Sequence, residues 1–181
     1  MLRKVFWWIK IKPAILDMKK IRHIIFFCTG NTCRSPMAEG IARKILAKRG
    51  VTDVKVESYG LLDLGSVPPA FPAQIACAAH GINISAHRSQ KITKQVAEKA
   101  DLILTMERMH VDWLIENVSE KLARKAFLIT EFGRSDHPAR EEPMEIPDPV
   151  DEPQRSYNRV FKMLENEIER IISYLITEDK I

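Results

Sequence analysis

The sequence predicts a three-layer α/β fold, in which helices cover both faces of a parallel sheet. Short runs rich in β-branched and aromatic residues alternate along the chain with longer amphipathic stretches, as expected of repeated strand–helix units. The chain has 181 residues, of which 45% are hydrophobic and 29% charged, and this suits one ordinary globular domain.

Four segments are expected to form the sheet. The first, Ile21–Phe27, is a continuous apolar-rich run typical of a central parallel strand. In the second, Val54–Tyr59, apolar and charged residues alternate, which indicates a strand with one buried face. The third and fourth strands are expected at Ala100–Thr105 and Ala126–Thr130.

Helices are expected between these strands and after the last one. The first would have Ser35 as its N-cap and Pro36 as its first helical residue, and would run to about Lys48, before Gly50. The other segments expected to be helical are Pro68–His80, Thr93–Lys99, Glu107–Asn117 and Gln154–Ile176. The last helix is expected to carry one apolar stripe, formed by Tyr157, Val160, Phe161, Leu164, Ile168, Ile171, Ile172 and Leu175. Glu131–Pro153 would form a long loop, and loops of that length are often functional.

The most informative segment follows the first strand. In a flavodoxin-like strand order, 2-1-3-4, ligands bind at the carboxyl end of the central first strand. There the chain reads Cys-Thr-Gly-Asn-Thr-Cys-Arg-Ser, from Cys28 to Ser35, and we call this segment the oxyanion loop. A cysteine six residues before an arginine, on a turn into a helix, suits a phosphate-like oxyanion held by backbone amides.

The residues of the oxyanion loop predict covalent catalysis. Its amides, the following helix N-terminus and Arg34 would stabilise a thiolate on Cys28, the expected nucleophile. Gly30 would supply backbone freedom, and Arg34 would bind two phosphoryl oxygens through its forked guanidinium. Cys28 would attack phosphorus, and water would then hydrolyse the phosphocysteine. The loop residues expected to bind substrate are Thr29, Gly30, Asn31, Thr32, Cys33 and Ser35.

The leaving group needs a general acid, and Asp148 is the best candidate. Pro147 and Pro149 flank it and would stiffen a loop that reaches over the site. The alternatives are a merely solvated acidic loop, or another acid nearby: Asp136, Asp151 or Glu152.

Further residues could support the loop. Asn31 and Ser35 could brace it by hydrogen bonds, with Ser58 and His87 approaching from elsewhere, although an ordinary structural role is the alternative for His87. Cys33 could form a reversible disulfide with Cys28, or could simply be a small packing residue. We expect no metal and no cofactor, because the cysteine spacing and the histidines do not match zinc-ligand patterns.

Net charge and cysteine content limit the other functions and locations that this chain could have. Residues 1–20 carry six Lys or Arg and one Asp, a net charge of +5, so residues 21–181 carry −1 of the total of +4 and show no nucleic-acid signature. Residues 1–20 are expected to be a basic extension of one domain, 21–181. Residues 1–17 could rest on a membrane surface, but a start assigned too far upstream, with Met18 the true start, is favoured. Three cysteines make no secreted disulfide framework, so a cytoplasmic location is expected. We also expect a monomer.

The motif closely resembles the low-molecular-weight protein tyrosine phosphatase family. Its hallmark, Cys-x5-Arg-Ser-Pro-x-Ala-Glu directly after the first strand, corresponds to Cys28–Glu39, and its late Asp-Pro pair to Asp148-Pro149. The resemblance implies a phosphatase that acts on phosphorylated proteins, with Asp148 as the acid. It also implies bracing of the loop by Asn31, Ser35, Ser58 and His87.

Two residues depart from the tyrosine phosphatases of this family, which usually carry an aliphatic residue in place of Thr32 and an aromatic one in place of Val150. Thr32 instead resembles the bacterial protein-arginine phosphatase branch, whereas Val150 fits neither branch. We therefore expect phosphoarginine or phosphotyrosine as substrate, with a slight preference for phosphoarginine. The alternatives are an arsenate reductase, which would need two further redox cysteines where only Cys77 follows, and a non-catalytic module that binds phosphorylated residues.

Overall fold

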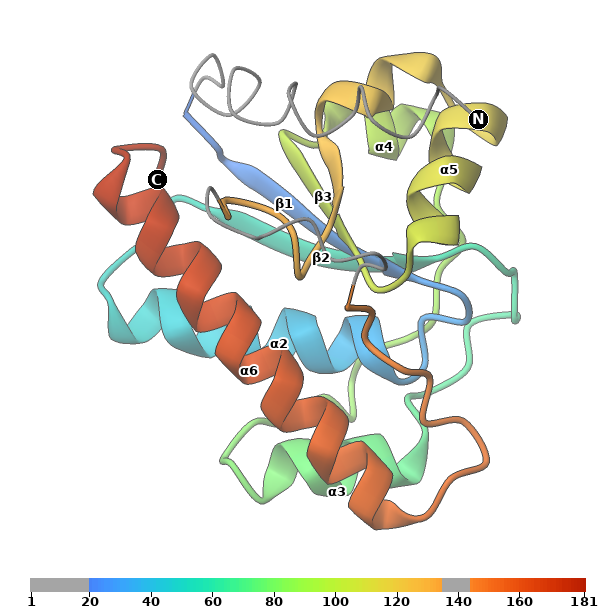
Figure 1. Cartoon of the computed structure of the whole chain (residues 1–181). Helices are drawn as coiled ribbons and strands as arrows, with labels where there is room; N and C mark the ends of the chain where they lie inside the picture. The colour runs from blue at the N-terminus through green and yellow to red at the C-terminus, as the bar shows by residue number, and fades with distance from the viewer. Residues whose placement is uncertain (1–19, 135–143) are drawn as a thin grey trace.

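The computed structural model describes residues 20–134 and 144–181, and it contains a four-stranded parallel sheet in the order β2-β1-β3-β4. The strands are β1 (His23–Cys28), β2 (Lys55–Gly60), β3 (Leu102–Thr105) and β4 (Ala126–Leu128). The α/β fold and its strand order are confirmed. Because β1 lies between β2 and β3 and is parallel to both, its carboxyl end lies next to the carboxyl ends of these two strands (Figure 1).

Helices cover both faces of the sheet (Figure 1). On one face lie α2 (Arg34–Lys48), α3 (Phe71–Ala78) and α6 (Gln154–Thr177), and on the other lie α4 (Lys94–Lys99) and α5 (Arg108–Asn117). A 3₁₀ helix, Glu120–Arg124, precedes β4 and was not expected from the sequence. Among the described residues, no helix has the length and apolar character required to cross a membrane.

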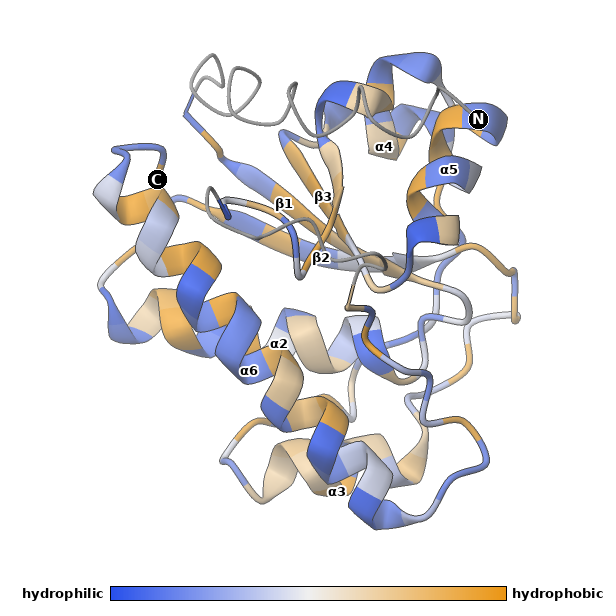
Figure 2. Cartoon of the chain, in the orientation of Figure 1, coloured by the Kyte–Doolittle hydropathy of each residue, from blue (hydrophilic) through white to orange (hydrophobic). Residues whose placement is uncertain are grey.

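The alternation of side chains along β1 divides the core in two. Ile24, Phe26 and Cys28 face the cluster formed with α2, α3 and α6, whereas Ile25 and Phe27 face the cluster formed with α4 and α5. Figure 2 shows β1 and β3, the two central strands, as mostly hydrophobic, as expected of a sheet covered on both sides. Cys28 therefore lies at the end of a strand whose two faces are both packed against helices.

The apolar stripe of α6 anchors that helix over α2. The residues expected on the stripe are all buried: Tyr157, Val160, Phe161, Leu164, Ile168, Ile171, Ile172 and Leu175. Glu167 is also buried on this helix, paired with Arg134 and Arg170. The stripe prediction is confirmed, and the buried ion cluster adds a polar feature that hydrophobic periodicity could not indicate.

The start of α2 differs from the prediction. Cys33 is the N-cap and the helix begins at Arg34, so the expectation that Ser35 caps the helix is wrong. Ser35 lies within the first turn, and its hydroxyl contacts Cys28 and Asn31 instead of a helix amide. Pro36 still lies in the first turn, where its missing N–H breaks no helical hydrogen bond.

Other boundaries shift by a few residues. The helix expected at Pro68–His80 is α3, Phe71–Ala78, and the strand expected at Ala126–Thr130 ends at Leu128. The interpretations of residues 1–17 and Met18, and the rival acid Asp136, lie outside the described residues.

Candidate active site

The oxyanion loop curls around the sulfur of Cys28. The backbone N–H of Asn31 donates to Cys28 Sγ at 3.3 Å, and Ser35 Oγ lies 3.0 Å from the same sulfur. Both contacts come from groups next to the N-terminus of α2, whose dipole favours negative charge. Two hydrogen-bonding groups of the loop therefore contact the Cys28 sulfur.

Asn31 holds the loop in shape. Its φ of 54° is in the left-handed region, which asparagine tolerates better than most side chains. Its Nδ2 donates to Ser35 Oγ and to Ser58 Oγ, at 2.9 Å each, and its Oδ1 accepts from the backbone N–H of Gln90 at 2.9 Å. This fully buried side chain therefore joins the loop to β2 and to the segment before α4.

Glu39 and His87 extend the brace. Ser58 donates to Glu39 Oε2 at 2.7 Å, and His87 Nδ1 lies 3.7 Å from the same oxygen. His87 Nε2 lies 3.2 Å from both Asn31 O and Asn31 Oδ1, and burial lowers the pKa of His87. The geometry thus brings together all four expected brace residues and adds Glu39, which sequence reasoning did not assign to this network.

Arg34 is buried with only 1% of its surface exposed, and three oxygens surround its guanidinium. Nη1 donates to Ile146 O at 3.0 Å and lies 2.8 Å from Glu107 Oε2, while Nη2 is hydrogen-bonded to Asp148 Oδ2. A buried cation requires such partners, because desolvation of an unpaired charge is costly.

Asp148 is therefore held beside the oxyanion loop by Arg34. Its segment is also attached to the residue that follows β3, because the Ile146 N–H donates to Met106 O at 2.9 Å. Val150 N–H donates to Asp148 Oδ1 at 3.3 Å, and the Val150 side chain is half exposed. Asp151 and Glu152 are exposed, and neither is among the partners of Arg34.

The remaining loop residues have different surroundings. Thr32 is partly exposed, and its carbonyl accepts from Ala70 N–H at 2.9 Å, which ties the loop to the start of α3. Cys33 is buried, with Tyr157 Oη 3.8 Å from its sulfur, and burial raises its pKa. Thr29 and Gly30 are partly exposed, and the three cysteines carry free thiols. A disulfide between Cys28 and Cys33 stays a prediction.

Sequence reasoning missed Glu107 and His110. His110 is fully buried, and its Nε2 lies 3.0 Å from Thr29 Oγ1 and 3.4 Å from Glu107 Oε2. The available signal was position: both residues follow the third strand, whose carboxyl end meets that of β1 at one edge of a parallel sheet. They had been assigned only to a helix and its start.

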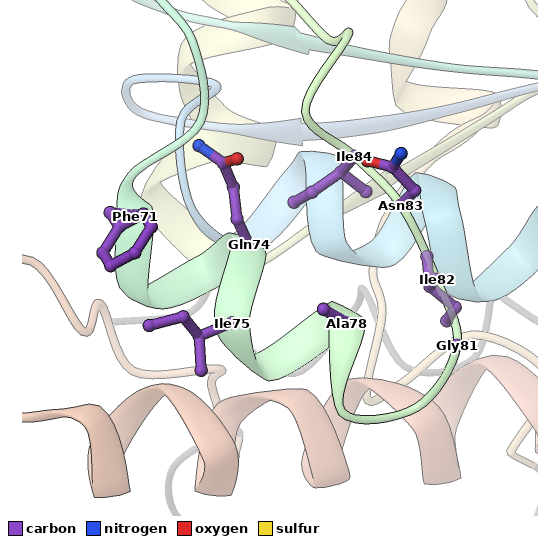
Figure 3. Close-up of a pocket in the computed structure, with 8 residues that line it drawn as sticks. All are labelled: Phe71, Gln74, Ile75, Ala78, Gly81, Ile82, Asn83 and Ile84. Carbon is purple, nitrogen blue, oxygen red and sulfur yellow. The ribbon is translucent and has the colours of Figure 1, made fainter.

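The described residues also form a hollow of about 500 Å³ beside α3, away from Cys28. Figure 3 shows side chains from α3 and the following segment around it, and none of the residues that line it belongs to the oxyanion loop. Within residues 20–134 and 144–181, no three His, Cys, Asp or Glu side chains gather closely enough to bind a metal ion.

Comparison with known proteins agrees with this geometry. Residues 23–180 match the family described as low molecular weight phosphotyrosine protein phosphatase. This chain belongs to that family. It is 34% identical over 146 residues to the low-molecular-weight protein-tyrosine-phosphatase Etp of Escherichia coli K12. The aligned residues cover 81% of this chain and 89% of that relative. Members of the family are cysteine-based protein phosphatases, and this protein is an enzyme of that class.

Solved phosphatase structures share the fold. The YwlE arginine phosphatase of Geobacillus stearothermophilus is 29% identical, with a TM-score of 0.75 over 87% of this chain and 94% of that one. A YwlE arginine phosphatase mutant with a phosphorylated active-site serine is 28% identical, with a TM-score of 0.74 over 85% of this chain and 95% of that one. The proteins similar to this chain thus include phosphatases named for tyrosine and phosphatases named for arginine.

Proposed function

We propose that this phosphatase works through a phosphocysteine on Cys28. The observation that carries the proposal is the pair of donors at the sulfur, Asn31 N–H at 3.3 Å and the Ser35 hydroxyl at 3.0 Å. These donors stabilise the attacking thiolate and the thiolate released in the second step. The Cys28 S–P bond forms as the bond from phosphorus to the leaving group breaks, and water then cleaves the S–P bond to give inorganic phosphate.

Arg34 would bind the transferred phosphoryl group. Protein oxygens already occupy Nη1, which donates to Ile146 O at 3.0 Å and lies 2.8 Å from Glu107 Oε2. The edge formed by Nε and Nη2 is therefore the one that would meet two phosphoryl oxygens, after Asp148 leaves Nη2. Charge that develops on those oxygens in the transition state is stabilised more strongly in this buried site than in water.

Asp148 would act as general acid and then as general base. It protonates the leaving group in the first step, and it accepts a proton from the attacking water in the second. Its contact with Arg34 supports this role, because a carboxyl group next to the phosphate-binding arginine is within reach of the leaving atom. Asp151 and Glu152 lack that contact.

The substrate is proposed to be a phosphorylated protein, with phosphoarginine favoured slightly over phosphotyrosine. Thr32 supports this preference, since its hydroxyl adds polarity, which suits a guanidinium phosphoramidate better than a phenyl ring. Val150 does not decide the preference, because it fits neither branch of the family; this half-exposed aliphatic side chain supplies no aromatic face for a phenyl ring. Named relatives include phosphatases of both kinds.

The mechanism is tested by trapping the intermediate. Wild type should hydrolyse p-nitrophenyl phosphate, and rapid acid quenching should leave phosphate on the peptide that contains Cys28. Cys28→Ser should lose turnover, whereas Cys77→Ala, which changes a buried thiol in α3 and outside the oxyanion loop, should retain the intermediate. Full activity of Cys28→Ser would refute the mechanism, and binding of phosphate without any turnover by wild type would indicate a binding module.

The substrate preference is tested separately with matched peptides. The kcat/KM of wild type for a phosphoarginine peptide should exceed that for a phosphotyrosine peptide, and Thr32→Ile should reverse the order. An unchanged ratio after this substitution would remove Thr32 from the explanation.

A further inference from the structure

His110 lies in the first turn of α5, wedged beside the oxyanion loop with 0% of its surface exposed. Its ring meets the edge of Phe27 with centroids 5.7 Å apart, and Phe27 immediately precedes Cys28. A polar ring that is fully buried at this place needs partners for both nitrogens.

The hydrogen bonds of His110 define which nitrogen carries its proton. The backbone N–H of Glu107 donates to Nδ1 at 3.2 Å, so Nδ1 presents its lone pair and the ring hydrogen is on Nε2. Burial, and then the charge of Arg34, lower the pKa of His110 to about 4, so the ring is neutral at physiological pH.

The Nε2–H group is hydrogen-bonded to one oxygen of the site and lies near a second. Thr29 Oγ1 lies 3.0 Å away and Glu107 Oε2 lies 3.4 Å away. Thr29 begins the turn of the oxyanion loop, and the other partner, Glu107, lies 2.8 Å from Arg34 Nη1. One buried donor therefore contacts both the loop and the carboxylate that orients the arginine.

We propose that His110 is a positioning residue for the phosphatase reaction: its Nε2–H group fixes Thr29 of the oxyanion loop, and its ring holds the backbone N–H of Glu107 and lies against the Glu107 carboxylate that contacts Arg34. The inference rests on the proposed role of Arg34 in phosphate binding. His110 is not a base for Thr29, because its lone pair is engaged by Glu107 N–H and its other nitrogen already carries hydrogen.

Two substitutions separate this role from helix capping. The amide nitrogen of Gln reaches the position of Nε2, so His110→Gln keeps a donor for Thr29 and Glu107. The side-chain oxygen of Asn reaches the position of Nδ1, so His110→Asn keeps an acceptor for Glu107 N–H and loses the distant donor. His80→Asn, at an exposed histidine stacked on Phe161, is the matched control.

The readouts are kcat/KM with p-nitrophenyl phosphate and the Kd of inorganic phosphate by calorimetry. His110→Asn should lower kcat/KM about tenfold and weaken phosphate binding, whereas His110→Gln and His80→Asn should stay within about threefold of wild type. Equal values for His110→Asn and His110→Gln at similar melting temperatures would overturn the proposal.

Thr29 supplies a second test if the histidine variants do not fold. Thr29→Val removes the acceptor with little change of shape, and Thr29→Ser keeps the hydroxyl. Only Thr29→Val should weaken phosphate binding, and equal binding by both variants would count against the inference. Phosphate binding is measured without turnover. If wild type did not hydrolyse aryl phosphates, the proposed mechanism would be refuted, but the comparison of phosphate binding by Thr29→Val and Thr29→Ser would still test the role of His110.

Discussion

The side-chain amide of Asn31 donates to the hydroxyl of Ser58 with 2.9 Å between the heavy atoms, and so joins the oxyanion loop to β2. Ser58 in turn donates to Glu39 Oε2. Since all three side chains are buried or nearly so, the loop is held in a left-handed turn by a polar network within the protein.

Ser58→Ala should destabilise the protein and reduce its activity. The change leaves Asn31 Nδ2 and Glu39 each without one partner, which should cost about 1–3 kcal/mol in the free energy of unfolding. Urea unfolding and kcat/KM with p-nitrophenyl phosphate measure both effects. Ser85→Ala, at an exposed serine, should leave both unchanged, and equal behaviour of the two variants would exclude the brace.

Asp148→Asn should slow the reaction most for poor leaving groups. An amide cannot donate a proton to the departing oxygen, so kcat should fall about 100-fold or more with phenyl phosphate. The fall should be smaller with p-nitrophenyl phosphate, whose leaving group is more stable as an anion. Asp151→Asn is the matched control, and a larger loss in that variant would transfer the role of general acid to Asp151.

Arg34→Lys should retain the positive charge but lose the forked guanidinium that can donate to two oxygens at once. A lysine cannot bind two phosphoryl oxygens while also contacting Glu107 and Ile146 O, so kcat/KM should fall about 100- to 1,000-fold. Steady-state kinetics checks this, with Arg159→Lys on the exposed face of α6 as control. A loss below about threefold would show that charge alone suffices.

The pH dependence of stability should report on His110, because its pKa is lowered from 6.5 to about 4. Above pH 6.5 the ring is neutral in both the folded and the unfolded chain, and its stabilising effect is complete. As the pH falls toward 4, only the unfolded chain takes up the proton, so the free energy of unfolding should decline by about 3 kcal/mol.

Urea unfolding of wild type and His110→Gln between pH 7 and 4 isolates this effect. His87 also has a lowered pKa, and it contributes with the same sign in both proteins. The variant should therefore show the shallower decline. Parallel curves for the two proteins would mean that His110 does not titrate as described.

The sequence was a good guide to elements whose burial follows a simple period. The continuous apolar run of β1 and the stripe of α6 both predicted their structures, because hydrophobic burial decides them. Ser35 shows where this reasoning fails. A serine before a proline is a common helix start, but here contacts with Cys28 and Asn31 determine where its hydroxyl points.

The site was only partly predictable for a related reason. Cys28 and Arg34 share a local spacing, which a single sequence displays. Glu107 and Asp148 meet Arg34 only because parallel strands end at a common edge, and local sequence carries little record of such long-range contacts. His110 looked like an ordinary helical residue, because its importance depends on which groups the fold places around it.

The contact between Arg34 and Asp148 has a consequence for the interpretation of kinetics. The arginine that would bind phosphate also retains the acid in place, so the two side chains form one thermodynamically coupled unit. Losses measured for single substitutions at these positions will not add. A double-mutant cycle over Arg34→Lys and Asp148→Asn is required to divide the barrier between oxyanion binding and proton transfer.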